Sequence, residues 1–255
     1  MERGAILERL TLPRVPLTWR LATVVDVRSE TPRARTIVLS VPNWPGHLAG
    51  QHVDVRLTAD DGYQAERSYS IASPPEDPDL ALTVEQINDG EVSQYLCEEL
   101  RAGDEFELRG PIGGYFTWQV ADGGPLLLLA GGSGVVPLAA MLRHRAAQES
   151  LVAADLLLSA ATWDDVLYRD ELDRFGRDGV AVRYTLTRAA PPGWSGWSRR
   201  VDTDMLRELG PEPRDRPRAF VCGPTPFVER VADLLVRLGH DPRLIKTERF
   251  GPTGG

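Results

Sequence analysis

The segment ERSYSIAS, residues 66–73, combines a cation, an aromatic ring and hydroxyl groups in one short stretch. Its alternation of apolar and small polar residues predicts a half-buried β-strand, with Arg67, Tyr69 and Ile71 on one face. A guanidinium binds phosphate through paired hydrogen bonds, and a tyrosine ring offers a plane for stacking. The pair therefore suits a ligand that is both flat and anionic. The alternative is a surface arginine that covers a core tyrosine.

The segment AGGSGVVP, residues 130–137, joins an apolar run to a helical stretch. Gly131, Gly132 and Gly134 let the backbone approach a ligand closely, and the following helix N-terminus favours negative charge. Pro137 fits the first helical turn, but it stands where a GxGxxG fingerprint has its last glycine. The context favours a dinucleotide-binding turn over an ordinary tight strand-to-helix turn.

A second strand-to-helix turn is predicted in FVCGPTPF, residues 220–227. It places Cys222 at the carboxyl end of a strand, on the same sheet edge as the first turn, where ligands of such sheets bind. The alternative is a buried core cysteine. A nucleophilic cysteine needs a neighbouring base, and no histidine is close in the sequence, so we do not expect one here.

The segment DGEVSQYL, residues 89–96, places Ser93 near the start of a predicted helix. A serine there either caps the helix or leaves the first amide hydrogens free for a phosphate. Taken alone, the segment favours capping.

The elements around these motifs fall into two classes, and the pattern changes near residue 120. Before it, short alternating segments separated by Pro and Gly predict an antiparallel β-barrel or sandwich with one helix over residues 92–100. The predicted strands are 21–27, 35–41, 52–58, 67–73, 80–86 and 104–110.

After residue 120, strands alternate with helices, and the fully apolar PLLLLA is typical of a parallel strand buried on both faces. Five such strands predict a doubly wound parallel α/β domain. The predicted strands are 125–130, 154–161, 180–187, 218–223 and 244–250, and the helices are 137–148, 164–175, 202–210 and 225–239. The predicted division of this β plus α/β chain is an N-terminal arm over 1–17, a barrel over 18–120 and an α/β domain over 121–255.

Composition excludes several classes of function. The chain has 255 residues and a net charge of −8, which disfavours nucleic acid and anionic membranes as partners. It has no apolar run long enough for a membrane span and no signal-peptide core, so we expect a cytoplasmic protein. Cys97 and Cys222 are too few for an iron–sulfur cluster, and the four histidines lack metal-ligand spacing, so no metal is expected.

Together the motifs resemble those of the ferredoxin–NADP reductase superfamily, in order, from about residue 18 to the end. RSYS is similar to its flavin motif RxYS, GEVS to its flavin-phosphate turn, and GPIGGYF to the GPxGxF segment that closes the barrel. AGGSGVVP is similar to the AGGTGxxP nucleotide turn and CGP to the CGP motif. ERF, residues 248–250, stands where plant-type members end in an acidic residue and an aromatic.

The resemblance implies a bound FAD. Arg67 would pair with the pyrophosphate, Tyr69 would pack on the isoalloxazine, and Ser70 would hydrogen-bond near flavin N5. An ideal strand turns Ser70 away from Tyr69, so we expect a bend or a backbone contact there. FAD is favoured over FMN because Arg67 and Ser93 suit a pyrophosphate. The implied flavin-binding residues are Arg67, Ser68, Tyr69, Ser70, Val84, Glu85, Gly90, Val92, Ser93 and Phe250.

The resemblance also implies a nicotinamide nucleotide whose C4 lies between Cys222 and Glu248, with Phe250 covering the flavin until nicotinamide displaces it. Relatives that prefer NADPH often have an arginine where this chain has Ala161, although Arg188 or Arg200 could still reach a phosphate. NADH is therefore slightly favoured. The implied catalytic residues are Ser70, Cys222 and Glu248, and the implied nucleotide-binding residues are Gly131, Gly132, Ser133, Gly134, Arg188, Arg200, Cys222, Gly223 and Pro224.

The resemblance implies an NAD(P)H-dependent flavoprotein reductase. The CxxxxCxxC run of a plant-type ferredoxin domain is absent, so we expect electrons to pass to a separate ferredoxin, oxygenase, or molybdenum or haem protein. Residues 1–56 hold eight arginines against five acidic residues, which fits either a basic docking face or scattered charges. Two alternatives are a reductase of diffusible flavin and a non-catalytic subunit that binds flavin or nucleotide to sense redox state.

Overall fold

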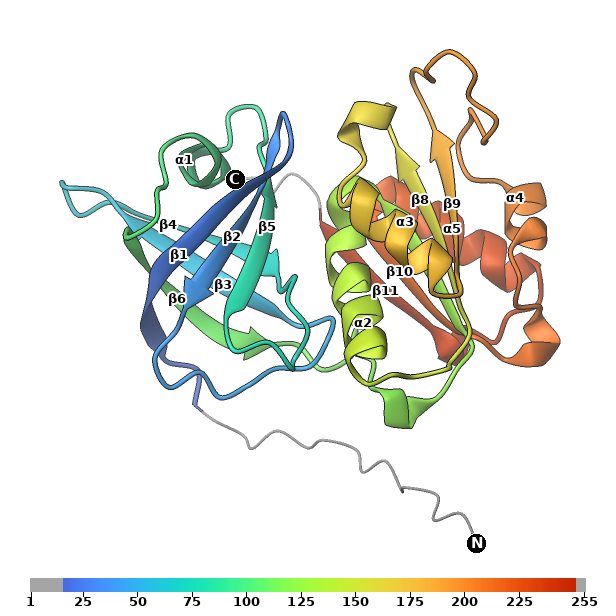
Figure 1. The fold of residues 1–255 in the computed structure, drawn as a ribbon, viewed down its shortest axis with the longest axis horizontal. Coiled ribbons are helices and arrows are strands. Elements are labelled where there is room, and N and C mark those ends of the chain that lie inside the picture. The colour runs from blue at the N-terminus through green and yellow to red at the C-terminus, as the bar shows by residue number, and fades with distance from the viewer. Residues whose placement is uncertain (1–15, 251–255) are drawn as a thin grey trace, which may run out of the picture.

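The computed structural model describes residues 16–250, and two sheets lie side by side in it (Figure 1). The first is an antiparallel sheet of six strands in the order β4-β3-β6-β1-β2-β5. Buried and outward-facing side chains alternate along its strands. In β3, for example, Val53 and Val55 are fully buried in the core, while Asp54 and Arg56 point outward. Its elements are β1 (Trp19–Thr31), β2 (Ala34–Ser40), β3 (His52–Thr58), β4 (Gln64–Ser70), β5 (Leu80–Glu85), α1 (Glu91–Glu98) and β6 (Glu105–Ile112).

The second sheet is parallel, with five strands in the order β11-β10-β7-β8-β9. Its strands are β7 (Leu126–Gly131), β8 (Ala154–Ala160), β9 (Val180–Leu186), β10 (Arg218–Pro224) and β11 (Ile245–Phe250). Its helices are α2 (Val135–Ala147), α3 (Arg169–Arg177), α4 (Thr203–Glu208) and α5 (Thr225–Arg237). Short 3-10 turns occupy Val120–Asp122, Gly132–Gly134, Trp163–Asp165, Pro213–Asp215 and Pro242–Leu244.

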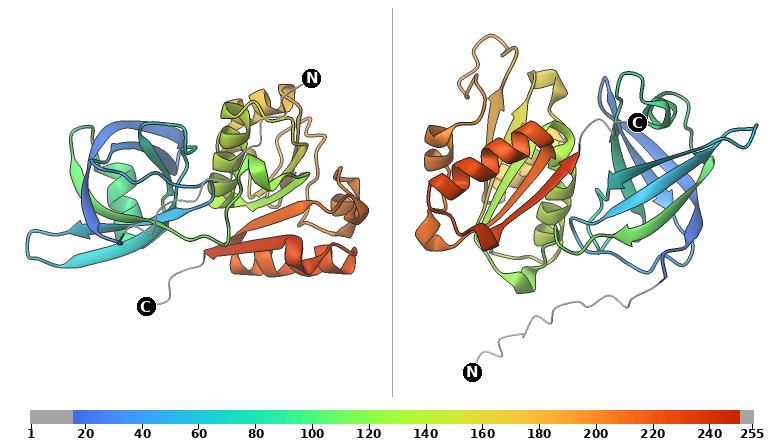
Figure 2. Two further views of the ribbon diagram at one scale, coloured as in Figure 1. Left: turned by 90° about the horizontal axis from the view of Figure 1, so that it is seen from below. Right: turned by 180° about the vertical axis from the view of Figure 1, so that it is seen from behind.

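The apolar run in β7 is buried on both faces because helices cover both sides of the sheet (Figure 2). Leu126 and Leu128 belong to the cluster under α2 and α3, whereas Leu127 and Leu129 belong to the cluster under α4 and α5. A strand that faces two cores needs apolar side chains at every position. The predicted β plus doubly wound α/β architecture is therefore confirmed.

Several elements differ from their predicted ranges, and the structure explains two of the differences. The helix predicted over 164–175 begins only at Arg169, because Tyr168 adopts a left-handed conformation (φ 59°) and Val166 packs into the core before it. The strand predicted over 67–73 lies at 64–70 instead. It ends at Ser70, and Ile71 then bridges to Leu82 of β5, so the expected change of direction follows Ser70.

The arm predicted over residues 1–17 lies mostly outside the described residues, which begin at 16 and enter β1 at Trp19. Within the described part of the chain, no helix is both long enough and apolar enough to cross a membrane.

The two sheets share buried contacts. Ala49, Ala72 and Phe116 from the first part of the chain belong to the same apolar cluster as the inner face of α2. Behind the cluster, the Tyr115 hydroxyl donates to the Ile245 carbonyl at 3.2 Å. These contacts fix where the edge of one sheet meets the other.

Candidate active site

Two strand-to-helix turns meet at the carboxyl edge of the parallel sheet. The strand register aligns Cys222 of β10 with Ala130 of β7 on one side and with Glu248 of β11 on the other. Gly134 packs so tightly here that an added Cβ would lie 2.1 Å from the Cys222 carbonyl oxygen. Only glycine permits this approach, which brings the start of α2 against the end of β10.

The same edge has a second close approach. An added Cβ at Gly223 (φ +152°) would lie 3.0 Å from the Gly131 Cα, and one at Gly131 would lie 2.8 Å from the Phe227 ring. Side chains are thus excluded from both turns, and bare backbone faces the helix N-termini. This is the surface that a pyrophosphate requires.

A cleft of about 520 Å³ opens over these turns. Four arginines line it, and none of them forms an ion pair with a carboxylate in the described part of the chain. Arg230, for example, donates only to the Val201 carbonyl, at 2.8 Å. Unpaired cations around an open cleft suit an anionic ligand. The arginines are Arg33, Arg188, Arg200 and Arg230. Six other site residues predicted from the sequence also line the cleft, and these are Gly131, Gly132, Ser133, Pro224, Glu85 and Phe250.

The structure therefore brings Arg188 and Arg200 to the same cleft, as their prediction requires, and it adds three charged residues that sequence reasoning missed. Arg33 and Arg230 lie on a hairpin and a helix with no motif to mark them. Asp165 closes a capping box, in which its carboxylate accepts from the Thr162 amide at 3.0 Å and the Thr162 hydroxyl at 2.7 Å. The TWDD spacing of that box was the one available signal.

Ser70 and Glu248 connect the two sheets at this edge. The Ser70 hydroxyl donates to Glu248 Oε1 at 3.3 Å, across the boundary between the barrel and β11. Burial raises the pKa of Glu248 to about 7, and the hydrogen bond from Ser70 opposes that rise. A carboxyl group with a near-neutral pKa can both hold and release a proton at physiological pH.

Cys222 lies directly beside this pair and is fully buried. Burial raises the pKa of the Cys222 thiol well above its usual value, and the neighbouring Glu248 raises it further. The thiol therefore stays protonated and is a poor nucleophile, which agrees with the sequence-based expectation.

Arg67 and Tyr69 share the inner face of β4, opposite Val55 and Val53 of β3. Tyr69 is half-buried, and burial raises its pKa, so its ring stays neutral. Arg67 is exposed, and its guanidinium donates only to the Glu66 carbonyl, at 2.7 Å, with no ion pair to a described carboxylate. A free guanidinium beside a half-buried ring is the arrangement predicted for a flat anionic ligand.

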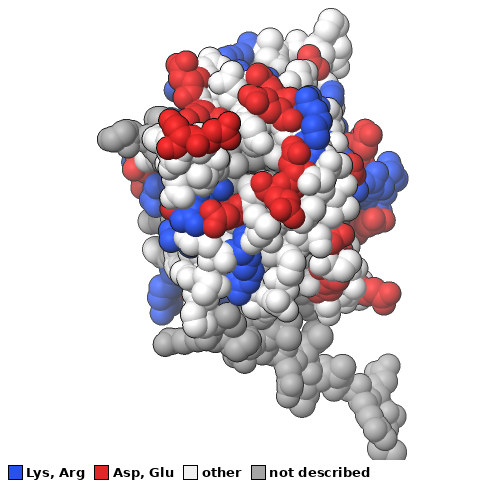
Figure 3. Space-filling model, turned by 90° about the vertical axis from the view of Figure 1, so that its left-hand side faces the viewer, with Lys and Arg blue, Asp and Glu red and all other residues white. Residues whose placement is uncertain are grey.

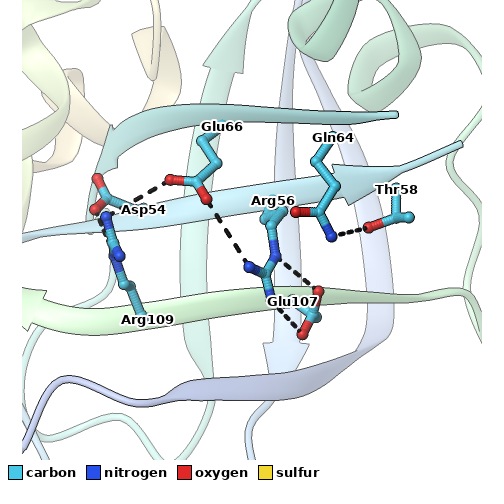
Figure 4. A network of polar contacts seen from close by, with 7 residues as sticks. All are labelled: Asp54, Arg56, Thr58, Gln64, Glu66, Glu107 and Arg109. Carbon is cyan, nitrogen blue, oxygen red and sulfur yellow. Dashed lines mark hydrogen bonds and ion pairs between the residues drawn. The ribbon is translucent and has the colours of Figure 1, made fainter. Parts of the chain in front are cut away.

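The outer face of the same strands contrasts with this arrangement (Figure 4). There Arg56 forms a two-bond ion pair with Glu107 at 2.7 and 2.9 Å, and Arg109 pairs with Asp54 at 2.9 Å. Both guanidinium groups also lie over the Trp19 ring. These two arginines are paired with carboxylates within the protein, whereas Arg67 has no ion pair with a described carboxylate and remains open to a ligand.

Ser93 does not cap α1 in the structure. It lies in the first turn of α1, and its hydroxyl donates to the Gly90 carbonyl at 3.0 Å and accepts from the Ile87 amide at 3.2 Å. No side chain caps α1, so the amides of its first turn remain available to a phosphate. The buried Ser93 hydroxyl stabilises this turn through its bonds to the Ile87 amide and the Gly90 carbonyl.

Three further predicted residues lie at different depths. Ser68 points to the outer face, where its hydroxyl donates to Asp54 at 2.6 Å, and Val92 is buried under α1. The Val84 side chain is fully buried in the barrel core, so the structure does not bring it into the cleft. Only the backbone at Val84 and Val92 remains to face a ligand.

Comparison with known proteins agrees with this geometry. Two family models match the chain, the Oxidoreductase FAD-binding domain over residues 22–117 and the Oxidoreductase NAD-binding domain over residues 128–233. The chain is therefore an oxidoreductase whose cofactors are FAD and a nicotinamide nucleotide. It belongs to the ferredoxin–NADP reductase superfamily, as its motifs predict.

Two curated relatives are similar over most of the chain. The glycine betaine monooxygenase reductase subunit of Pseudomonas aeruginosa is 32% identical over 255 residues, covering 94% of this chain and 68% of the relative. Ferredoxin–NADP reductase B of Sorangium cellulosum is 32% identical, covering 90% of this chain and 96% of the relative.

Solved structures show the same fold. The FAD/NAD-binding domain of nitric oxide dioxygenase from Vibrio cholerae superposes with a TM-score of 0.81 at 22% identity, covering 91% of this chain and 99% of that one. An Amycolatopsis cytochrome P450 reductase gives 0.81 at 28% identity, covering 98% and 74%.

Replacing Gly134 with alanine should disrupt the site. The new methyl group would meet the Cys222 carbonyl, so we expect a loss of about 1–3 kcal/mol of stability and at least tenfold weaker nucleotide binding. Urea unfolding and a nucleotide titration measure the two effects. Gly176→Ala in α3, where an added Cβ meets nothing within 4 Å, is the matched control. Equal behaviour of the two variants would contradict the close approach.

The raised pKa of Glu248 predicts a pH-dependent stability. The folded protein holds this proton more tightly than the unfolded chain, so the contribution of the neutral carboxyl is full below pH 4.5 and is lost as the pH rises to about 7. Between those values the wild type should lose stability relative to Glu248→Gln, as urea midpoints at each pH would show. Glu208→Gln, on the exposed side of α4, controls for charge removal. A difference that is constant with pH would refute the shift.

Proposed function

We propose that this chain is the reductase component of an electron-transfer pair, which accepts hydride from NAD(P)H and passes electrons through FAD to a separate redox protein. The Ser70–Glu248 hydrogen bond is the principal support, because it joins the flavin barrel to the nucleotide sheet at the edge where both cofactors must meet. The relative that is a monooxygenase reductase subunit supports the same role.

The residues present fit both cofactors. When bound, the flavin accepts hydride and can release its electrons one at a time. Arg67 would hold the pyrophosphate, with the uncapped amides of α1 nearby, and Tyr69 would pack on the ring. The bare turns at Gly131 and Gly134 would hold the nicotinamide nucleotide. Glu248 would hold a proton on its carboxyl group, whose Oε1 accepts from the Ser70 hydroxyl.

We propose NADH as the preferred nucleotide. Ala161 lines the cleft where an arginine would grip a 2′-phosphate, and the Asp165 carboxylate lies in the same cleft, where NAD sites often place an acceptor for ribose hydroxyls. Arg188 and Arg200 would then pair with the pyrophosphate.

The partner is proposed to be an oxygenase component or a ferredoxin. The outer end of the barrel shows basic and acidic side chains interspersed, with acidic groups gathered in its upper half (Figure 3). This end is not a uniform basic face, so charge alone does not select an acidic partner there.

Arg67→Ala should loosen the flavin. Charge-assisted hydrogen bonds contribute about 1.5–3 kcal/mol, so we expect roughly tenfold weaker FAD binding and partial apoprotein after purification. Absorbance and reconstitution titrations measure this. Arg101→Ala is matched, because Arg101 is also exposed and also donates to the carbonyl of its preceding residue. Unchanged flavin occupancy in Arg67→Ala would remove Arg67 from the site.

Anaerobic mixing with each nucleotide tests the function itself. The protein should stay yellow through gel filtration, NADH should bleach the flavin faster than NADPH, and the reduced protein should then reduce an acceptor from a panel of ferredoxins and oxygenase components. Loss of flavin on the column would favour a diffusible-flavin reductase. No bleaching by either nucleotide would overturn both enzymatic interpretations.

A further inference from the structure

A chain of hydroxyl groups crosses the boundary between the two sheets, away from the nucleotide cleft. The Tyr168 hydroxyl donates to Thr83 Oγ1 of β5 at 2.5 Å, Thr83 lies 2.8 Å from Thr36 Oγ1 of β2, and Thr36 donates to Glu30 Oε1 of β1 at 2.7 Å. Each hydroxyl has one hydrogen, so Thr83 must donate to Thr36. The hydrogen bonds therefore all point in one direction, from Tyr168 of the α/β domain into the barrel, and the last one ends on the Glu30 carboxylate.

Tyr168 is held in place by its surroundings. It is 5% exposed and precedes α3 in a left-handed conformation, which a non-glycine residue adopts only when its neighbours require it. The Arg143 guanidinium lies 4.5 Å from the centre of its ring. The hydroxyl is thus aimed at β5 by both its backbone and its packing.

Arg143 makes a second connection across the same boundary. From α2 it forms a two-bond ion pair with Glu171 of α3 at 2.9 and 2.5 Å, and its remaining Nη1 donates to the Ala72 carbonyl at 2.6 Å. Ala72 is two residues beyond Ser70. The α2 helix begins at the nucleotide turn, so one rigid helix links that turn to the segment that holds Ser70.

We propose that Tyr168 and Arg143 are positioning residues that set the separation of nicotinamide and flavin for hydride transfer, an inference that rests on the proposed function. They fix two barrel segments, the one after Ser70 and the one before Glu85, against the helices of the nucleotide domain. Directional hydrogen bonds hold two bodies at one separation, whereas apolar contacts tolerate sliding. Hydride transfer depends steeply on this separation, and a 1 Å misplacement costs on the order of a hundredfold.

The test is Tyr168→Phe, measured by anaerobic stopped-flow reduction over a range of NADH concentrations. The ring remains under Arg143, and Thr83 keeps its bond to Thr36, so folding and flavin content should be retained. We expect the limiting rate of flavin reduction to fall about tenfold, while the nucleotide Kd changes less than about twofold. A nucleotide deuterated at the transferred position should show that the hydride step is the one being slowed.

Tyr184→Phe is the matched control. Tyr184 belongs to the same domain, and its buried hydroxyl has no hydrogen-bond partner among the described residues. This variant also removes one tyrosine hydroxyl, but it breaks no hydrogen bond between the two domains. Its limiting rate of flavin reduction should therefore match that of the wild type. An equal fall in both variants would assign the effect to general destabilisation and overturn the proposal.

Hydrogen exchange of the flavin-bound protein, without nucleotide, gives a readout that does not depend on catalysis. Amides of residues 80–85 should exchange about fivefold faster in Tyr168→Phe than in either the wild type or Tyr184→Phe, because a bond that anchors β5 is lost. Thr83→Val removes the other partner, and the double variant Tyr168→Phe/Thr83→Val should be no slower in reduction than Thr83→Val alone.

The outcomes separate the two hypotheses. A wild type that neither nucleotide reduces would overturn the proposed function. A wild type that is reduced, with Tyr168→Phe reduced at the same limiting rate, would overturn the positioning role and leave the function standing. Additive effects of Tyr168→Phe and Thr83→Val on the limiting rate would likewise show that the bond between them does not set the separation.

Discussion

The backbone contact between Gly134 and the Cys222 carbonyl is the constraint on which the rest of the site depends. It brings the N-terminus of α2 to the carboxyl edge of β10, so the positive end of that helix and a bare turn face the same cleft. The strand register then places Glu248 beside Cys222 without further adjustment. Because β11 is the outermost strand, Glu248 also reaches the barrel, where Ser70 is its partner.

Burial at this edge determines which protonation states the site can use. The Cys222 thiol is fully buried and the Glu248 carboxyl is half-buried beside it, so burial raises the pKa of both groups, and Glu248 raises the pKa of the thiol further. The thiol is held neutral, whereas the carboxyl titrates near pH 7. One residue is thereby fixed as a packing group and the other becomes the proton-holding group, although neither differs chemically from its counterparts elsewhere in the chain.

The sequence predicted the architecture and the two glycine turns that line the cleft, because glycine turns and apolar runs depend on local backbone geometry. Arg67 and Tyr69 share a face because alternation in a strand is local. The hydrogen bond from Ser93 to the Gly90 carbonyl could not be predicted because it depends on where α1 begins, and the core position of the Val84 side chain could not because it depends on the partners of β5. Arg230 could not be found, since its place at the cleft arises from the packing of α5 on β10, which no short-range pattern encodes.

The two faces of β4 and its neighbouring strands explain why Arg67 has no carboxylate partner although Arg56 and Arg109 do. On the outer face, carboxylates from neighbouring strands occupy Arg56 and Arg109, and this order holds the strands in register. On the inner face, Val53 and Val55 lie across from Tyr69 and Arg67 and offer no carboxylate. Arg67 is unpaired because its cross-strand neighbours are apolar, and an unpaired cation at the rim of a core has a phosphate as its natural partner. Valine at positions 53 and 55 of β3 therefore leaves Arg67 unpaired, so this face of β4 favours an anionic ligand.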